Sequence, residues 1–100
     1  MPTLSYRADQ FTLANPYNTP TTLYEALVSL LPNQGFTSVT NAGDHVHCDI
    51  QGISLSITFL ALSGNTYWRL IMAGEDSNPA NADTQIDRVQ GLIDVLQGGS

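Results

Sequence analysis

The sequence contains no lysine and only three arginines against nine acidic residues, which gives a formal net charge of −6. Nucleic-acid binding draws most of its affinity from Lys and Arg side chains that neutralise phosphates. A chain with so few cations is poorly equipped to bind nucleic acid or an anionic membrane surface, so we expect neither as a partner. The net charge does favour solubility.

Cysteine, long apolar runs and cofactor motifs are also scarce or missing. The single cysteine, Cys48, excludes a disulfide within the chain and fits a reducing compartment. No apolar stretch approaches the ~20 residues that a membrane span needs, and no signal peptide is visible at the N-terminus. Phosphate-binding and dinucleotide-binding motifs are missing too. We therefore expect a cytoplasmic protein without a cofactor.

The length and hydrophobic content fit one small globular domain. The chain has 100 residues, of which 42% are hydrophobic and only 12% are charged. Such a chain can form one core without metal or disulfide support. We predict a single domain over residues 1–100, with an irregular segment at residues 1–20 and a flexible tail at residues 98–100.

Two segments have the apolar periodicity of helices. The first helix is expected to begin at a capping box formed by Thr22 and Glu25, with Thr19 followed by Pro20 as a competing start. The second is expected to begin at Asn78 as cap, with Pro79 in its first turn. Its buried stripe would comprise Ile86, Val89, Ile93 and Leu96.

Residues 36–73 alternate between apolar and polar side chains with a period of two, which predicts four strands joined by hairpins. Three two-residue loops, each with a glycine, would join them: Ala42-Gly43, Gln51-Gly52 and Ser63-Gly64. These loops place apolar residues opposite one another: Val39 and Val46, Ile50 and Ile53, Phe59 and Trp68. The agreement of all three registers favours one apolar face.

The predicted fold is α+β: a four-stranded antiparallel β-meander with two helices packed on one face, in the order α-β-β-β-β-α, forming a two-layer sandwich. The other face would be polar and nearly uncharged. Its predicted residues are Ser38, Thr40, His45, His47, Asp49, Ser54, Ser56, Thr58 and Arg69.

The densest chemical cluster of the sequence is His45, His47 and Asp49. On a strand, these residues project to one side, whereas Cys48 between them projects to the other. Imidazole and carboxylate together suit zinc or a similar metal ion. The three residues are therefore candidate metal ligands, and the alternative is an exposed polar strand with neutral histidines.

A second candidate site lies at the last predicted hairpin, where apolar and aromatic residues point outward. It comprises Leu60, Leu62, Tyr67, Arg69 and Ile71. Such residues can form a patch that binds a partner or a second copy of the chain. The alternative is that residues 1–20 cover them, with Phe11 and Tyr17 packing over the patch.

The acidic stretch from Gly74 to Asn78 departs from a calcium-binding loop in length and lacks its late glutamate. We interpret it as a solvated connection between a strand and a helix. No catalytic constellation is recognisable elsewhere.

These observations favour a non-enzymatic protein-interaction or self-associating module, of adaptor or chaperone type, with a protein partner or a homodimer. In acidity and order of elements the chain resembles small acidic bacterial secretion chaperones, which pair helices with an antiparallel sheet and act as dimers. It is shorter and lacks the helix that interrupts their sheet. The alternatives are a metal-binding or histidine-dependent enzyme using His45, His47 and Asp49, and a small-molecule binder.

Overall fold

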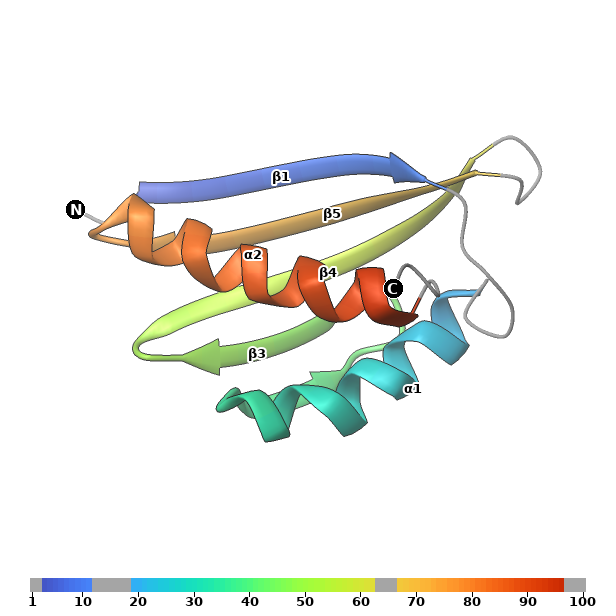
Figure 1. The fold of residues 1–100 in the computed structure, drawn as a ribbon, viewed down its shortest axis with the longest axis horizontal. Coiled ribbons are helices and arrows are strands. Elements are labelled where there is room, and N and C mark those ends of the chain that lie inside the picture. The colour runs from blue at the N-terminus through green and yellow to red at the C-terminus, as the bar shows by residue number, and fades with distance from the viewer. Residues whose placement is uncertain (1–2, 12–18, 63–66, 97–100) are drawn as a thin grey trace.

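The computed structural model describes residues 3–11, 19–62 and 67–96, with only the backbone at 9–11, 61–62 and 67–68. Its centre is one antiparallel sheet of five strands in the order β1-β5-β4-β3-β2 (Figure 1). The strands are β1 (Thr3–Phe11), β2 (Thr37–Asn41), β3 (Val46–Ile50), β4 (Ile53–Leu62) and β5 (Tyr67–Asp76). The helices are α1 (Pro20–Leu30), which continues as a 3₁₀ turn (Leu31–Gln34), and α2 (Pro79–Leu96).

Strand β1 corrects the predicted four-stranded meander and the predicted irregular segment at residues 1–20. It pairs with β5 without interruption from Thr3 opposite Asp76 to Phe11 opposite Trp68. The first strand of the chain thus lies beside the last one, at one edge of the sheet. Residues 3–11 extend the sheet and do not cover it, while residues 12–18 and the predicted tail at 98–100 lie outside the described residues.

Both helices lie on the same side of the sheet (Figure 1). Helix α2 contacts β5 and β1, and helix α1 contacts β2 and β3. Between the helices and the sheet lies one cluster of buried side chains, to which both helices and strands β3, β4 and β5 contribute. The predicted α+β class with two helices on an antiparallel sheet is therefore confirmed.

Helix α1 begins at the competing start. The Thr19 hydroxyl oxygen accepts a hydrogen bond from the Thr22 backbone N–H at 3.3 Å, and Pro20 occupies the first turn. The predicted start at Thr22 is wrong, because Thr22 is the third residue of the helix. After the 3₁₀ turn, Gly35 adopts a positive φ of 90° and ends the helical path.

Helix α2 follows the prediction closely. The Asn78 side-chain oxygen accepts a hydrogen bond from the Ala80 N–H at 3.2 Å, which makes Asn78 the cap. Ile86, Val89 and Ile93 are buried as expected, and Leu96 is partly buried against them. Within the described parts of the chain, neither helix combines the length and hydropathy of a membrane span.

The β3–β4 hairpin has the predicted register, with Ile50 opposite Ile53. The β4–β5 hairpin is two residues longer than predicted: Leu62 pairs with Tyr67, and Phe59 faces Leu70 instead of Trp68. A shift of two residues keeps each side chain on its face, because strand alternation has a period of two. Phe59 and Leu70 are both buried.

The β2–β3 register is also wrong in the prediction: Asn41 pairs with Val46, so four residues and not two lie between the paired positions, and β2 contains a bulge in addition. Thr37 lies opposite Asp49 but Asn41 lies opposite Val46, so β2 holds one residue more than β3 over this stretch. Ser38 has a φ of 53°, which marks the irregularity. The predicted Val39–Val46 pair therefore does not form.

Candidate interaction surface

The outer face of the sheet, the side away from the helices, carries the exposed side chains that need explanation. No described element lies over it (Figure 1). The strand registers and the alternation of side chains place thirteen of the described side chains on this face. They are Leu4, Tyr6 and Ala8 from β1, Arg69, Ile71, Ala73 and Glu75 from β5, Ser54, Ser56, Thr58 and Leu60 from β4, and His47 and Asp49 from β3.

Strand β1 has an inverted pattern, with its apolar residues on the uncovered side. Leu4 and Tyr6 project outward and are 61% and 62% exposed, whereas Ser5 between them is buried beneath α2. Amphipathic strands normally turn their apolar residues toward the core. Strand β1 thus places apolar side chains on the outer face and the polar Ser5 side chain on the covered face.

The polar residues on the covered side of β1 are held by α2. The Ser5 hydroxyl donates a hydrogen bond to the Pro79 carbonyl oxygen at 3.3 Å. The Arg7 guanidinium lies 2.5 Å from the Asp87 carboxylate, in a pair that remains partly open to solvent. Both contacts give the inward polar groups partners, as buried polar groups require. They fix which side of β1 faces outward.

The predicted binding residues lie partly within this surface. Leu60 on β4 is directly opposite Arg69 on β5, and Ile71 follows two positions along β5 on the same face. Leu60 is 46% exposed, Arg69 is exposed and Ile71 is half-buried. Leu62 and Tyr67 pair with one another at the end of the same hairpin, but their side chains lie outside the described ones.

The apolar part of the outer face has a definite arrangement. Ile71 and Ala73 lie in the middle of β5, with Tyr6 opposite Ala73 and Ala8 opposite Ile71 on β1. On the same face, Arg69 lies two residues before Ile71 and Glu75 lies two residues after Ala73. Neither side chain makes an ion pair or a hydrogen bond with another described residue. The β5 strip therefore runs from a cation through two apolar residues to an anion.

The β3 side of the outer face is polar and holds the predicted metal-binding residues. His47 Nε2 lies 3.3 Å from Asp49 Oδ1, to which the Ser54 hydroxyl also donates at 3.1 Å. His45 lies before the strand and pairs with Asp44 at 2.7 Å, a hydrogen bond that lowers the pKa of Asp44. The Ser54 hydroxyl thus donates to a carboxylate and not to a histidine.

The three candidate ligands are divided between these two pairs. Among the described residues, no three His, Cys, Asp or Glu side chains are grouped so that they could hold a metal ion. His47 and Asp49 remain a pair of potential ligands, and His45 turns to Asp44. The metal hypothesis stays a prediction without support from this geometry.

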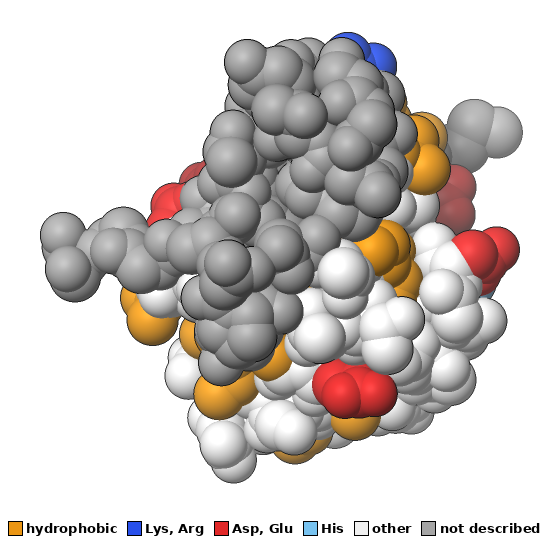
Figure 2. All heavy atoms as spheres, turned by 90° about the vertical axis from the view of Figure 1, so that its right-hand side faces the viewer, with side chains coloured by type: hydrophobic (Ala, Val, Ile, Leu, Met, Phe, Trp, Pro, Cys, Tyr) orange, Lys and Arg blue, Asp and Glu red, His pale blue; other side chains and the backbone are white. Residues whose placement is uncertain are grey.

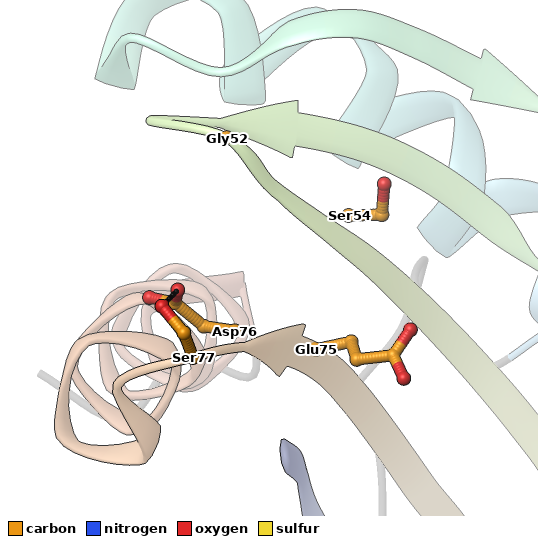
Figure 3. Close-up of a pocket in the computed structure, with 5 residues that line it drawn as sticks. All are labelled: Gly52, Ser54, Glu75, Asp76 and Ser77. Atoms are coloured by element: carbon orange, nitrogen blue, oxygen red, sulfur yellow. Dashed lines mark hydrogen bonds between the residues drawn. The ribbon is translucent and has the colours of Figure 1, made fainter. Parts of the chain in front are cut away.

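A shallow hollow of about 360 Å³ lies where β5 ends and α2 begins. Its lining residues are Gly52, Ser54, Glu75, Asp76 and Ser77 (Figure 3). Glu75 projects away from Asp76 and Ser77, so its carboxylate and that of Asp76 do not converge (Figure 3). The Asn81 amide, 2.9 Å from Asp76, holds the pKa of that carboxyl below its ordinary value. Of the connection predicted from Gly74 to Asn78, the first three residues belong to β5, and only Ser77 and Asn78 connect β5 to α2.

Cys48 lies on the covered side of β3, as predicted, and is fully buried in the core. Burial raises the pKa of its thiol to about 12, and the nearby Asp49 carboxylate adds to the rise. A thiol with so high a pKa is almost entirely protonated near neutral pH, and the thiolate is the reactive form. Cys48 is a core residue and not a nucleophile.

Taken together, fold and surface define an α+β domain with helices on one side of a five-stranded antiparallel sheet and an open, partly apolar face on the other. Figure 2 shows the end of the molecule that lies on the right in Figure 1. Most of the described surface at this end is neither charged nor hydrophobic. Comparison with known proteins adds no relative: no family model, curated protein or solved structure matches the chain.

Sequence reasoning missed the β1 contribution to the outer face. The alternation of Leu4, Tyr6 and Ala8 with Ser5 and Arg7 was a usable signal for a strand. It would nevertheless have directed Leu4 and Tyr6 into the core, because only the contacts with α2 determine the orientation.

Proposed function

We propose that the chain is a non-enzymatic protein-interaction module, of adaptor or chaperone type, and that the outer face is its binding surface. The carrying observation is the exposure of Leu4 and Tyr6 on an uncovered face, 61% and 62%, next to the half-buried Ile71 and the 46% exposed Leu60. Exposed apolar side chains gathered on one uncovered face are typical of an interaction site.

The orientation of β1 supports the proposal. Turning β1 over would bury Leu4 and Tyr6, and burial of a large apolar side chain stabilises a domain by about 1.5–3 kcal/mol. The chain instead keeps these side chains in water and places Ser5 and Arg7 beneath α2. A surface that a partner covers explains why this arrangement is retained.

The chemistry of the remaining residues agrees with a binding role. Cys48 is buried with a raised thiol pKa, and Ser54 donates its hydrogen bond to Asp49. Tyrosine and arginine, which are enriched among the residues that dominate binding energy, occur on the outer face as Tyr6 and Arg69. Contacts of this kind give affinity without a reaction.

Site-specific photocrosslinking tests the proposal. Tyr6 is replaced by the photoreactive residue p-benzoylphenylalanine, and the full chain is irradiated at low concentration in the cells that naturally express it. The matched control carries the same residue at Val95, which is 69% exposed but lies on α2, on the helix side of the molecule. We expect a protein adduct at position 6 and none at position 95.

The identity of the adduct separates the classes of partner, since mass spectrometry distinguishes a second copy of this chain from another protein. Equal labelling at the two positions, or no protein adduct at position 6, overturns the proposed function. Position 6 keeps an aromatic side chain in the labelled variant, so the outer face retains its apolar character.

A further inference from the structure

We infer that the partner on the outer face is a second copy of this chain, packed face to face about a two-fold axis that passes over β5 at the position of Met72. This inference rests on the proposed function, because it names the occupant of the same surface. A two-fold interface requires a patch that is complementary to itself. The outer face of β5 meets that requirement.

The self-complementarity comes from the order of residues along β5. The axis lies between the two sheets and runs perpendicular to the strands, so the two copies of β5 cross antiparallel. Arg69 of one copy then faces Glu75 of the other, and Ile71 faces Ala73, each pairing occurring twice. Arg69 and Glu75 are about 20 Å apart along the strand, with Met72 halfway between them.

The neighbouring strands fit the same axis. Tyr6 lies opposite Ala73 on β1, close to the axis, so each Tyr6 ring faces Ala8 of the other copy along the β1 edge of the interface. Leu60, opposite Arg69 on β4, faces Ser54, which lies opposite Glu75. On β5 and β1, the apolar residues Ile71, Ala73, Tyr6 and Ala8 thus occupy the middle of the contact and the charged pairs lie at the ends of β5, whereas β4 contributes Ser56 and Thr58 to the middle. An apolar centre with charged residues outside it is the usual arrangement of stable interfaces.

The twist of the sheets leaves the charged pairs within reach. Aligned sheets pack about 10 Å apart with their strands rotated by roughly 30°. At about 10 Å from the axis, this rotation displaces Arg69 from the partner's Glu75 by only about 5 Å, a gap that long side chains bridge.

The available area is sufficient for a specific dimer. Three strands of about 30 Å and two of about 16 Å, spaced about 4.8 Å apart, give the outer face a footprint of roughly 600 Å². The accessible area of protruding side chains exceeds this footprint and approaches the ~800 Å² per partner that standard complexes bury. The net charge of −6 per chain opposes association, so the local Arg69–Glu75 pairs must offset a general repulsion.

Charge reversal separates the local pairs from the general repulsion. Arg69→Glu and Glu75→Arg each bring like charges together across the interface, and the double variant restores opposite charges with the net charge of −6 unchanged. Glu75→Arg alone reduces the net charge to −4. If general repulsion governed association, this variant would dimerise more tightly, whereas the inferred interface requires it to dimerise more weakly.

The experiment is sedimentation velocity on the purified full chain from micromolar to near-millimolar concentration, with far-UV circular dichroism of each variant to verify folding. We expect a reversible dimer whose dissociation constant rises at least about tenfold in each single variant and returns to within about threefold of wild type in the double variant. The control Glu25→Arg makes the same charge change on the exposed side of α1 and leaves the dimer intact or strengthens it.

Other outcomes overturn the inference. A wild-type monomer at all concentrations, single variants that behave like Glu25→Arg, or a double variant without recovery each contradict the two-fold contact. A monomer that still crosslinks to another protein through position 6 removes the self-association and leaves the proposed function standing. Absence of both removes the two together.

Discussion

The close approach of Gly74 to Leu55 leads to a stability prediction in which one chemical change has opposite effects at two sites. Gly74 is buried on the covered side of β5, opposite Leu55 on β4. A Cβ atom at Gly74 would lie 2.4 Å from the Leu55 Cδ2 atom, whereas carbon atoms pack best at about 3.5–4.0 Å. In a Gly74→Ala variant, Leu55 must therefore move by more than about 1 Å within the core.

The cost follows from the burial of Leu55, which is only 2% exposed and has no solvent to move into. Inserting one methyl group into a well-packed core costs typically about 1–3 kcal/mol. For a domain of this size, 1 kcal/mol corresponds to about 4–8 °C in Tm. We expect Gly74→Ala to lower the free energy of unfolding by about 2 kcal/mol and Tm by roughly 10 °C.

The matched control is Gly91→Ala in helix α2. Gly91 is exposed, and a Cβ atom there would meet nothing within 4 Å. Alanine is favoured over glycine in a helix interior by about 0.8–1.0 kcal/mol, so this variant should be more stable than wild type. Urea unfolding followed by circular dichroism, at one protein concentration for all variants, gives both values.

A double variant identifies the clash as the cause. Leu55→Val removes the Cδ2 atom, so Gly74→Ala should cost much less in that background than in wild type, and the difference is the coupling energy between the two positions. A Gly74→Ala variant as stable as wild type, or an equal cost in both backgrounds, would refute the packing argument.

Three further predictions concern two buried titratable groups, Tyr24 and Cys48. The Tyr24 hydroxyl accepts a hydrogen bond from the Phe59 N–H at 2.7 Å and donates to the Asp44 carbonyl oxygen at 3.2 Å. Urea unfolding should show that Tyr24→Phe lowers the free energy of unfolding by about 1–3 kcal/mol. The control Tyr6→Phe, on the exposed surface, should change it by no more than about 0.5 kcal/mol. Because burial raises the pKa of Cys48 from 9.0 to about 12, its folded thiol should react with Ellman's reagent only as fast as the protein unfolds, and rapid labelling at pH 8 would contradict this. The folded pKa lies above the unfolded one, so stability from the protonated thiol is present below about pH 9 and falls as pH rises toward 12; Cys48→Ala should flatten that part of the stability profile.

The β3–β4 hairpin shows where local sequence is enough. Gln51 and Gly52 both have positive φ, 51° and 80°, as the two central residues of a tight hairpin turn of type I′ require. Glycine accepts this conformation readily, and two residues leave no alternative register for strands whose apolar residues must share one face. Loop and strand pattern therefore specify the same pairing.

The other two hairpins show what alternation leaves open. A two-residue shift preserves every side-chain direction, so the apolar pattern of β4 and β5 fits a loop of two residues or of four. The Ser63-Gly64 dipeptide favoured the shorter loop, but Leu62 pairs with Tyr67. In β2, the residue with positive φ at the bulge is Ser38 and not a glycine, so no signal in the sequence predicts the bulge.

Strand β1 shows why the surface was harder to predict than the fold. Alternation states which side chains share a face, but an element elsewhere in the chain decides which of the two faces is covered. For β1 that element is α2, whose Pro79 carbonyl and Asp87 carboxylate lie more than seventy residues away in sequence and receive Ser5 and Arg7. Hydrophobicity alone would have sent Leu4 and Tyr6 inward. The contacts with α2 thus leave Leu4 and Tyr6 exposed, and the crosslinking and sedimentation experiments test the proposal that a partner covers them.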